Sequence, residues 1–445
     1  MTGELAPAMG SRSVTSRARF DDGFLWGTST SSHQVEGDNR GNDWWEWEKR
    51  PGKIRDGSTS GNAAEWWQGR AEDDLRAARA LGQNAHRLSL EWSRLEPERG
   101  RWDDAAFARY RELLRAARAL GLTLMVTINH FTLPAWLAAR GGWLAPEAPD
   151  EFAELARRAA TELGAEVELF CTQNEPNVLA LMGYADERWP PGLGNLGAAF
   201  RALAAMLEAH VRAYHAIHAV RPGAKVGLVL NLPILEPARP VLADRAIARL
   251  QDWAFSGALL FALERGVVLP PLAAYPTRVK GLNRALDWLG VNYYGRYAMT
   301  FDAHKGRELF GRNVGERSIR TAWNDWGEPH AAGLTTQLVR LARFGVPLYV
   351  TENGVMDPDD RLRPEFLRAH VRAVAEAVAR GSDVRGYFHW SLLDNFEWSE
   401  GWSAPFGLQA LDRSTQTRTL RASGELYARI CRGNGDERDE APADR

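Results

Sequence analysis

Short apolar segments and long helix-like segments alternate along nearly the whole chain, and this order constrains the fold most. Each short segment is mostly apolar and is bounded by Gly, Pro, Asn or charged residues, as buried strands are. The eight strand candidates are residues 24–30, 84–90, 122–128, 167–173, 225–231, 287–293, 347–352 and 385–391. Between them, segments such as 103–120, 151–163, 198–219 and 364–380 repeat apolar residues every three or four positions. The alternation predicts an α/β fold with parallel strands.

Eight strand–helix repeats without a linker-like break predict a single (β/α)8 TIM barrel. The 445 residues exceed an average domain, but one α/β barrel can reach this size. An open doubly wound sheet is the structural alternative. It is less favoured, because Gly23 and Gly27 at the first strand lack the spacing of a glycine-rich phosphate loop.

The two ends of the chain differ from this alternating part. Residues 1–18 are rich in Ser, Arg and Ala without periodicity, which predicts a disordered N-terminal arm. Residues 433–445 are charged and contain proline, which predicts a disordered C-terminal tail. The barrel is therefore expected to span residues 19–432.

Composition narrows the possible partners. The chain has 55 Lys and Arg against 57 Asp and Glu, so no excess charge would attract nucleic acid or anionic lipid. No apolar run is long enough to span a membrane, and the first twenty residues lack the apolar core of a secretory signal. Two cysteines, Cys171 and Cys431, make no disulfide framework and are expected to be buried thiols. We expect a cytoplasmic protein without nucleic-acid or membrane partners, and the sequence leaves a homo-oligomer open.

Two strand candidates end in a glutamate beside an amide, where a barrel places its functional groups. Glu175 follows Asn174, and Glu352 precedes Asn353. Hydrolysis of a glycosidic bond needs one carboxyl group to protonate the leaving oxygen and a second to attack the anomeric carbon or direct a water to it. Ordinary solvated or paired glutamates are the alternative interpretation. The repetition of one context at two strand ends favours the catalytic pair.

Other polar and aromatic side chains come at the same ends of the strands. They are Gln34 after the first strand, Arg87 within the second, His130 after the third, Asn292 and Tyr294 at the sixth, and Trp390, Glu397 and Trp398 after the eighth. Glu, Gln, His and Trp supply the hydrogen bonds and flat apolar faces that sugar rings need. We therefore expect one rim of the barrel to bind a sugar.

Five motifs in order along the chain show that it resembles glycoside hydrolase family 1, the β-glucosidase family. The motifs are Phe24–Gly27 with Ser31–Gly37, Thr172–Pro176, Asn292–Tyr294, Thr351–Gly354 and Trp390–Trp398. The resemblance extends from near Phe20 to near Arg432. It implies a (β/α)8 barrel, retention of anomeric configuration, no metal and no organic cofactor. The implied partner is a small-molecule β-glycoside or an oligosaccharide.

The resemblance also implies roles for the two glutamates. Glu352 matches the family's nucleophile and must be ionised, and a nearby Arg87 would lower its pKa. Glu175 matches the general acid/base, and the charge of Glu352 would raise its pKa. Tyr294 is expected to donate a hydrogen bond to Glu352, because it lies two residues after Asn292 and should share its face.

The remaining site residues follow from the same resemblance. Asn174 matches the residue that binds the sugar 2-hydroxyl, and Asn292 is expected to support catalysis. Residues expected to bind the substrate are Gln34, His130, Trp390, Glu397, Trp398 and Phe406. The expected activity is that of an exo-acting β-glycosidase, with β-glucosides as first substrate and β-galactosides or β-fucosides next.

Three functional alternatives stay open. A transglycosidase of the same fold would pass the sugar to an acceptor alcohol with the same catalytic groups. A catalytically silent sugar-binding barrel would show no turnover. A metal-dependent barrel hydrolase is disfavoured, because His33, His130 and His389 make no tight ligand spacing. The sequence does not define the natural glycone, the aglycone or the preferred chain length.

Overall fold

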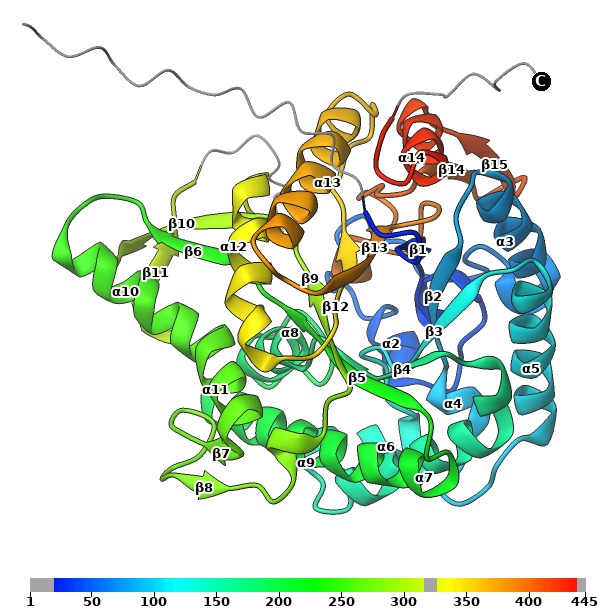
Figure 1. The fold of residues 1–445 in the computed structure, drawn as a ribbon. Helices are drawn as coiled ribbons and strands as arrows, with labels where there is room; N and C mark the ends of the chain where they lie inside the picture. Colours follow the sequence, from blue (N-terminus) through cyan, green and yellow to red (C-terminus); the bar gives the residue numbers. More distant parts are fainter. Residues whose placement is uncertain (1–19, 316–325, 438–445) are drawn as a thin grey trace, which may run out of the picture.

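Eight parallel strands close into a barrel at the centre of the molecule (Figure 1). The computed structural model describes residues 20–315 and 326–437. The barrel strands are β1 (Leu25–Ser29), β2 (Ala85–Ser89), β3 (Thr123–Asn129), β4 (Leu169–Asn174), β5 (Lys225–Asn231), β9 (Trp288–Asn292), β12 (Leu348–Asn353) and β13 (Val384–Trp390). Strand β13 pairs with β1 and closes the ring. The predicted (β/α)8 barrel is confirmed, and the open doubly wound sheet is wrong.

All eight predicted strands are present, each within two residues of its predicted limits. Their bodies are buried because one face meets the barrel interior and the other meets helices. One apolar cluster takes residues from seven strands of the ring and therefore fills its interior: Ala85, Met125, Leu169, Cys171, Val229, Trp288, Tyr349 and Phe388. A larger cluster lies between the strands and the helices.

A helix follows each barrel strand and covers the outside of the ring (Figure 1). In chain order these helices are α3 (Ala71–Ala80), α5 (Asp104–Ala119), α7 (Ala148–Leu163), α9 (Leu196–Val220), α11 (Ala258–Arg265), α12 (Ala331–Leu341), α13 (Arg363–Ala379) and α14 (Ala422–Arg432). Helix α5 illustrates the local signals. The Asp103 side chain accepts a hydrogen bond from the backbone of Ala106 at its start. Gly121, with φ of 78°, follows its last turn.

Short elements occupy the long connections after several strands. The short helices are α1 (Ser32–Val35), α2 (Asp43–Trp47), α4 (Trp92–Leu95), α6 (Ala135–Ala138) and α8 (Pro176–Leu179), and the longer helix α10 (Leu242–Asp252) precedes α11. Three π-helical segments are η1 (Trp66–Arg70), η4 (Ala180–Ala185) and η5 (Trp253–Gly257). Three small sheets are formed by β6 (Ile234–Pro237) with β10 (Arg296–Phe301) and β11 (Gly311–Asn313), by β7 (Val267–Val268) with β8 (Thr277–Arg278), and by β14 (Gln409–Asp412) with β15 (Thr417–Leu420). None of these sheets was predicted. In the first sheet, β6 and β10 begin so soon after barrel strands β5 and β9 that they resemble continuations of them.

The predicted terminal segments lie largely outside the described residues. The N-terminal arm, residues 1–18, lies wholly outside them, and so do residues 438–445 of the predicted tail. Residues 433–437 are described. Asn434 donates from Nδ2 to the Phe20 carbonyl at 2.7 Å and accepts from Trp26 Nε1 at 2.9 Å. These bonds connect the turn after α14 to the first described residues.

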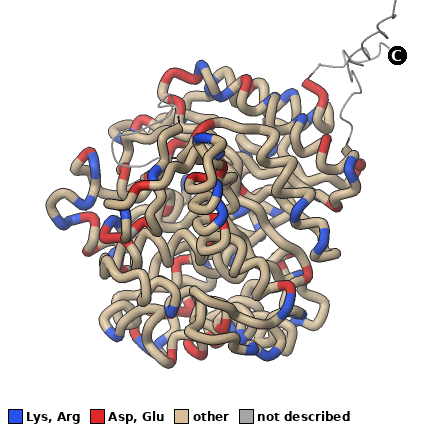
Figure 2. Tube along the Cα trace, turned by 90° about the vertical axis from the view of Figure 1, so that its left-hand side faces the viewer, with Lys and Arg blue, Asp and Glu red and all other residues tan. Residues whose placement is uncertain are grey.

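The distribution of charged residues and the burial of the two cysteines agree with the expectations from composition. Acidic and basic residues are interspersed along the trace (Figure 2), consistent with the net charge of −2. Cys171 and Cys431 are both buried and free, as predicted. Among the residues that the structure describes, no helix combines the length and the apolar character that crossing a bilayer requires.

Candidate active site

A cavity of about 630 Å³ opens beside the carboxyl ends of the barrel strands, and both strand-end glutamates line it. Its volume falls within the range of small-molecule sites, roughly 300–1,000 Å³. Of the predicted residues, Glu175, Glu352, Tyr294, His130, Trp390, Glu397 and Trp398 line this cavity. The two carboxyl groups therefore face one space.

A register shift at the end of β12 turns Glu352 toward the barrel axis. Val350 packs in the shell between strands and helices, so simple alternation would point Glu352 outward as well. The pairing with β9 shifts between Val350 and Glu352, and Glu352 pairs with Asn292. Such β-bulges re-aim side chains next to active sites.

Strand β4 has a similar register shift just before Glu175. Its pairing with β5 shifts between Cys171 and Asn174. Glu175 then adopts a left-handed backbone with φ of 44°, and its N–H donates to the Val229 carbonyl at 2.9 Å. Pro176, the first residue of α8, disfavours the right-handed helical conformation for the residue before it. A non-glycine residue held at positive φ is typical of functional sites.

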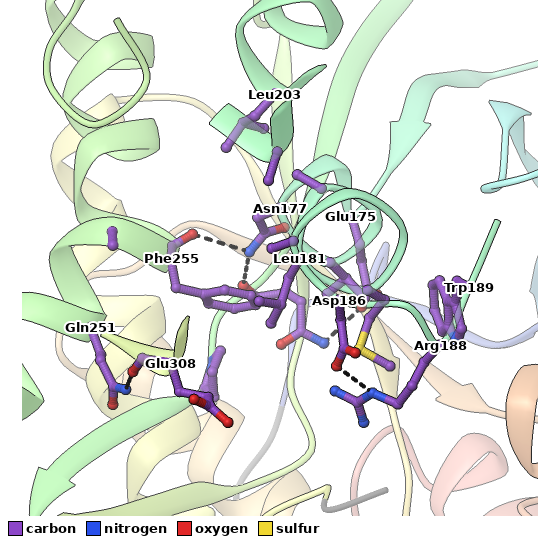
Figure 3. Close-up of a pocket in the computed structure, with 18 of the residues that line it drawn as sticks. Glu175, Asn177, Leu181, Asp186, Arg188, Trp189, Leu203, Gln251, Phe255 and Glu308 are labelled. Atoms are coloured by element: carbon purple, nitrogen blue, oxygen red, sulfur yellow. Dashed lines mark hydrogen bonds and ion pairs between the residues drawn. The ribbon is translucent and has the colours of Figure 1, made fainter. Parts of the chain in front are cut away.

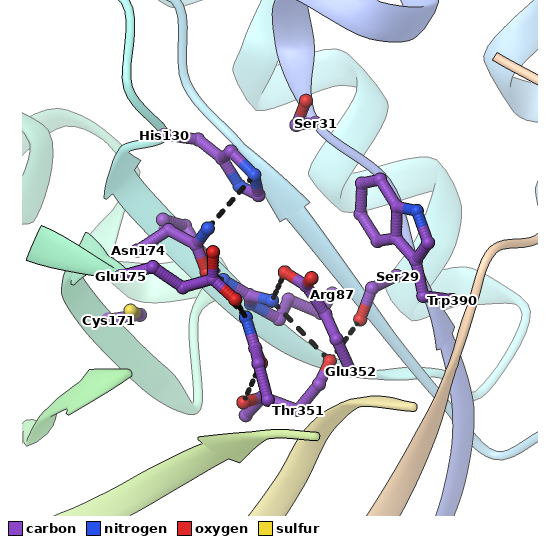
Figure 4. A network of polar contacts seen from close by, with 12 residues as sticks. Ser29, Ser31, Arg87, His130, Cys171, Asn174, Glu175, Thr351, Glu352 and Trp390 are labelled. Atoms are coloured by element: carbon purple, nitrogen blue, oxygen red, sulfur yellow. Dashed lines mark hydrogen bonds and ion pairs between the residues drawn. The ribbon is translucent and has the colours of Figure 1, made fainter. Parts of the chain in front are cut away.

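Both oxygens of Glu352 accept hydrogen bonds, one from the buried Arg87 (Figure 4) and the other from the half-buried Tyr294. Arg87 Nη1 donates to Oε1 at 2.5 Å, and the Tyr294 hydroxyl donates to Oε2 at 2.7 Å. The neighbouring Tyr293 instead donates to the His330 carbonyl at 2.7 Å. The structure thus places Tyr294, rather than Tyr293, against the carboxylate.

Glu175 has a different environment, made of neutral amides. Its Oε1 accepts from Asn292 Nδ2 and from Asn231 Nδ2, each at 2.8 Å. Asn231 ends β5 and was not predicted as a site residue. The sequence does contain a signal that could have identified Asn231. It is an amide at a strand end, like Asn174 and Asn292, and it lies on the one predicted strand without a site residue.

The pKa values of the two glutamates reflect these surroundings. Burial, and then the charge of Glu352, raise the pKa of Glu175 to about 8, against weaker lowering by its amide partners. Burial also raises the pKa of Glu352; Arg87 and Tyr294 act in the lowering direction, as predicted for Arg87, but burial outweighs them. Within residues 20–315 and 326–437, Glu352 has a cation in contact and Glu175 has none, which favours the negative charge at Glu352 and the proton at Glu175.

Hydrogen bonds of Asn174 link Arg87 to His130 (Figure 4). Its Oδ1 accepts from Arg87 Nη2 at 2.7 Å and from Asn292 Nδ2 at 3.1 Å, which orients its Nδ2 toward His130 Nε2 at 3.1 Å. Burial and Arg87 keep the pKa of His130 well below its ordinary value, so the ring is neutral. Nε2 then accepts, and the proton resides on Nδ1, which has no hydrogen-bond partner among the described residues.

Glu397 supplies a third carboxyl group to the cavity wall. Its Oε2 accepts from Trp390 Nε1 and Gln34 Nε2, each at 3.3 Å, and burial raises its pKa to about 8. Trp398 stacks against His130, with ring centroids 6.0 Å apart. These groups combine hydrogen-bonding atoms with flat apolar surfaces around one space.

Gln34 and Phe406, both predicted to bind substrate, lie behind the wall. Gln34 is fully buried and bonds to Asn395 Oδ1 at 2.8 Å in addition to Glu397. Phe406 packs edge-on against Tyr294 and Trp326. Neither lines the cavity, so their contribution to substrate binding stays a prediction.

The closed barrel and its cavity with a charged and a protonated glutamate define a class, the (β/α)8 enzymes that act through paired carboxyl groups. The sequence model described as Glycosyl hydrolase family 1 matches residues 16–436, and the chain belongs to this family. It is a β-glycosidase, and the resemblance seen in the motifs is confirmed.

Relatives in this family are named as beta-glucosidases, beta-galactosidases and 1,4-beta-D-glucan glucohydrolases. The chain is 32% identical to beta-glucosidase A of Thermotoga maritima, over 94% of this chain and 99% of that protein. It is 30% identical to a beta-galactosidase of Pyrococcus woesei, over 94% and 98% of the two chains. Among solved structures, it is similar to the beta-glucosidase from Thermotoga maritima in complex with glucoimidazole, with a TM-score of 0.86, 31% identity and coverage of 94% and 100%.

Proposed function

We propose that this protein is a retaining exo-β-glycosidase that releases terminal non-reducing sugars, β-glucosides first. The observation that carries the proposal is the unequal environment of two glutamates on one cavity. Glu352 contacts Arg87 and Tyr294, whereas Glu175 contacts neutral amides and has a pKa raised to about 8. Hydrolysis of a glycosidic bond requires one carboxylate and one carboxylic acid, and retention of configuration is what the family resemblance implies.

In the first step, the ionised Glu352 attacks the anomeric carbon. A bond forms between its carboxylate oxygen and that carbon as the glycosidic bond breaks. Glu175 donates its proton to the departing oxygen, so the aglycone leaves as a neutral alcohol. Arg87 and Tyr294 hold the attacking carboxylate in place through their hydrogen bonds to its two oxygens.

In the second step, Glu175 acts as a base. The glycosyl ester neutralises Glu352, so the charge that helped to raise the pKa of Glu175 is gone and this pKa falls. Glu175 then takes a proton from water, which attacks the anomeric carbon and frees Glu352. Two displacements at one carbon retain its configuration.

The sugar itself is expected to contact the walls around the pair. Asn174 is held by Arg87 and Asn292 where it can bond the 2-hydroxyl, an interaction that strengthens in the transition state. His130 and Glu397 supply hydrogen-bonding atoms, and Trp390 and Trp398 supply apolar faces. A glucosidase and a galactosidase among the relatives support both sugars as substrates.

The deciding experiment is covalent trapping. A 2-deoxy-2-fluoro-β-glucoside with an activated leaving group should inactivate the enzyme, and mass spectrometry of the digested protein should find the sugar on the peptide containing Glu352. Proton NMR of an ordinary aryl β-glucoside reaction should show the β-anomer first. An α-anomer as first product, or a label on another carboxyl group, would overturn the proposal.

The alternatives have separate tests. Product analysis with an added alcohol distinguishes a transglycosidase, since transfer products would then exceed free sugar. A turnover assay on aryl β-glycosides distinguishes a silent sugar-binding barrel. For a metal-dependent hydrolase the test is a chelator, which should leave activity unchanged; residues 20–315 and 326–437 contain no group of three or more His, Cys, Asp or Glu that could hold a metal ion.

A further inference from the structure

The bulge that turns Glu352 toward the barrel axis contains an extra residue, Thr351. The pairing of β12 with β9 passes from Val350 directly to Glu352 and skips Thr351. The Thr351 carbonyl instead accepts a hydrogen bond from the Ser29 hydroxyl at 2.7 Å. Thr351 is fully buried, and its own hydroxyl donates to Oδ1 of Asn292 at 2.6 Å. The bulge therefore directs a hydroxyl group at Asn292 as well as a carboxylate at the cavity.

The buried amide of Asn292 has a donor on one side and acceptors on the other. Its Oδ1 accepts from Thr351, while its Nδ2 donates to Oε1 of Glu175 at 2.8 Å and to Oδ1 of Asn174 at 3.1 Å. That oxygen of Asn174 also accepts from Arg87, so it needs a donor and not a second carbonyl from Asn292. The two ends of an amide differ in hydrogen bonding far more than in shape. These neighbours therefore fix which end faces Glu175.

The orientation of this amide decides which oxygen of Glu175 carries the proton. Oε1 accepts from the amides of Asn292 and Asn231, so a proton on Oε1 would point at groups that are donors themselves. Figure 3 shows Glu175 among the side chains that line the cavity. Its Oε2 has no hydrogen-bond partner among the residues that the structure describes. The proton therefore resides on Oε2, the oxygen that is left for the substrate.

We propose that Thr351 is a positioning residue for proton transfer: its hydroxyl holds the Asn292 amide with Nδ2 toward Glu175, and so keeps the proton of Glu175 on the oxygen that meets the leaving group. This inference rests on the proposed function, because it takes Glu175 as the proton donor. The bond also polarises the amide, since an accepting Oδ1 strengthens donation from Nδ2. After the aglycone has left, the same donation stabilises the Glu175 carboxylate until water delivers its proton.

Other charged and titratable groups also act on Glu175. They are Glu352 on β12, which raises its pKa, Arg87 on β2, which lowers it, and the neutral Tyr294 after β9. A test of Thr351 must leave these three groups in place. Valine has nearly the shape of threonine without the hydroxyl, and the backbone carbonyl that Ser29 holds is unchanged in Thr351→Val.

The first measurement is the pH profile of kcat/KM in Thr351→Val. This substitution leaves Oδ1 of Asn292 buried without its donor, so the amide holds the ionised form of Glu175 less well. The pKa of Glu175 should rise, and Glu175 should stay protonated to higher pH. The alkaline limb should therefore move upward, by up to about one pH unit.

The second measurement is the dependence on the leaving group. At neutral pH, Thr351→Val should lower kcat/KM for an alkyl β-glucoside about three- to tenfold, the effect of one hydrogen bond on a weaker and less well oriented acid. A dinitrophenyl β-glucoside leaves without a proton, so its kcat/KM should change less than about twofold. A loss of packing alone would lower both rates alike.

Three further variants isolate the hydroxyl. Thr351→Ser keeps it and should restore the alkaline limb and the leaving-group dependence nearly to wild type. Thr335→Val is the matched control, because it removes another buried threonine hydroxyl, one that donates to the Ala373 carbonyl at 2.9 Å between α12 and α13. It should leave both readouts unchanged. Thr351→Ala also lacks the hydroxyl and gives the same comparison if Thr351→Val does not fold.

The outcomes separate this inference from the proposed function. A wild-type protein that does not turn over aryl β-glucosides, or a Glu175→Ala variant with equal losses on both leaving groups, would refute the proposed function. With that function intact, an unmoved alkaline limb in Thr351→Val, or equal effects on the two substrates, would refute the role of Thr351. Equal defects in Thr351→Ser and Thr351→Val would refute it too, because the hydroxyl would not be their cause.

Discussion

Arg87 donates a hydrogen bond from Nη1 to Oε1 of Glu352 at 2.5 Å, and both side chains are almost fully buried, 1% and 4% exposed. A buried cation needs a buried anion, and separating the two is costly. Among the residues that the structure describes, Glu175 on the same cavity has no cation in contact, and its side chain accepts from the amides of Asn292 and Asn231. This asymmetry decides which carboxyl group attacks and which one donates a proton.

Replacing Glu352 by glycine should remove the nucleophile and leave a space beside the anomeric carbon. We expect kcat/KM on aryl β-glucosides to fall by roughly 10⁴-fold or more, equivalent to about 5 kcal/mol of transition-state stabilisation. Added azide should restore turnover and give an α-glycosyl azide, identified by NMR, because only one displacement occurs. Full activity without azide would contradict the assignment of Glu352.

Replacing Glu175 by alanine should affect substrates according to their leaving groups. An alkyl glucoside needs a proton on the departing oxygen and should lose about 10²–10⁴-fold in kcat/KM. A dinitrophenyl glucoside leaves without a proton, so its first step should be much less affected. Burst kinetics on the activated substrate should then show the glycosyl-enzyme accumulating. Equal losses on both substrates would exclude Glu175 as the proton donor.

The pH profile of the free enzyme should be limited at its alkaline end by Glu175. Activity requires this carboxyl group to be protonated, and its pKa is raised to about 8, so kcat/KM should fall as pH rises through about 8. The acid limb should come from protonation of Glu352, whose pKa burial raises above its ordinary value. The check is kcat/KM from pH 4 to 10. An alkaline limb that survives in Glu175→Gln would assign it to another group.

Asn231 should set the position of that alkaline limb. Its hydrogen bond to Oε1 stabilises the ionised form of Glu175 and so lowers its pKa. Asn231→Leu should therefore move the limb to higher pH, by up to about one pH unit. Gln251→Leu is a suitable control, because Gln251 lines the cavity without bonding to Glu175. A limb that stays in place in Asn231→Leu would show that this bond is unimportant.

The two glutamates could be predicted because parallel strands bring their carboxyl ends to one rim, whatever their separation along the chain. Their orientation could not be predicted in the same way. Alternation from Val350 points Glu352 outward, and only the register shift reverses this. A bulge of one residue depends on pairing with the neighbouring strand, which a single segment does not reveal.

Part of the cavity wall could not be predicted from the sequence either, for a related reason. Residues such as Phe200 and Phe255 follow helical spacing and are indistinguishable in sequence from core positions. Only the tertiary arrangement shows that they are half-buried beside a cavity. Connections after three different strands had to be placed in space before the wall could be seen.

Glu175 should reduce the stability of the protein at alkaline pH. Its pKa of about 8 exceeds the ordinary 4.5, so the native state binds more protons than the unfolded state between these values, and stability falls as pH rises. The difference corresponds to a loss of up to about 5 kcal/mol by pH 9, with most of the stability retained near pH 4. Glu175→Gln removes the charge but keeps an oxygen for Asn231 and Asn292.

Chemical denaturation of wild type and Glu175→Gln at pH 4.5 and pH 9 measures this effect. The two proteins should have similar free energies of unfolding at pH 4.5, and the variant should be more stable at pH 9 by a few kcal/mol. Glu98→Gln, an exposed surface substitution, serves as the control and should show no comparable gain. Equal stability of Glu175→Gln and wild type at pH 9 would mean that the Glu175 carboxylate is stabilised as well in the fold as in water. The proton donor would then have to be sought elsewhere, because a carboxyl group with an ordinary pKa is ionised at neutral pH.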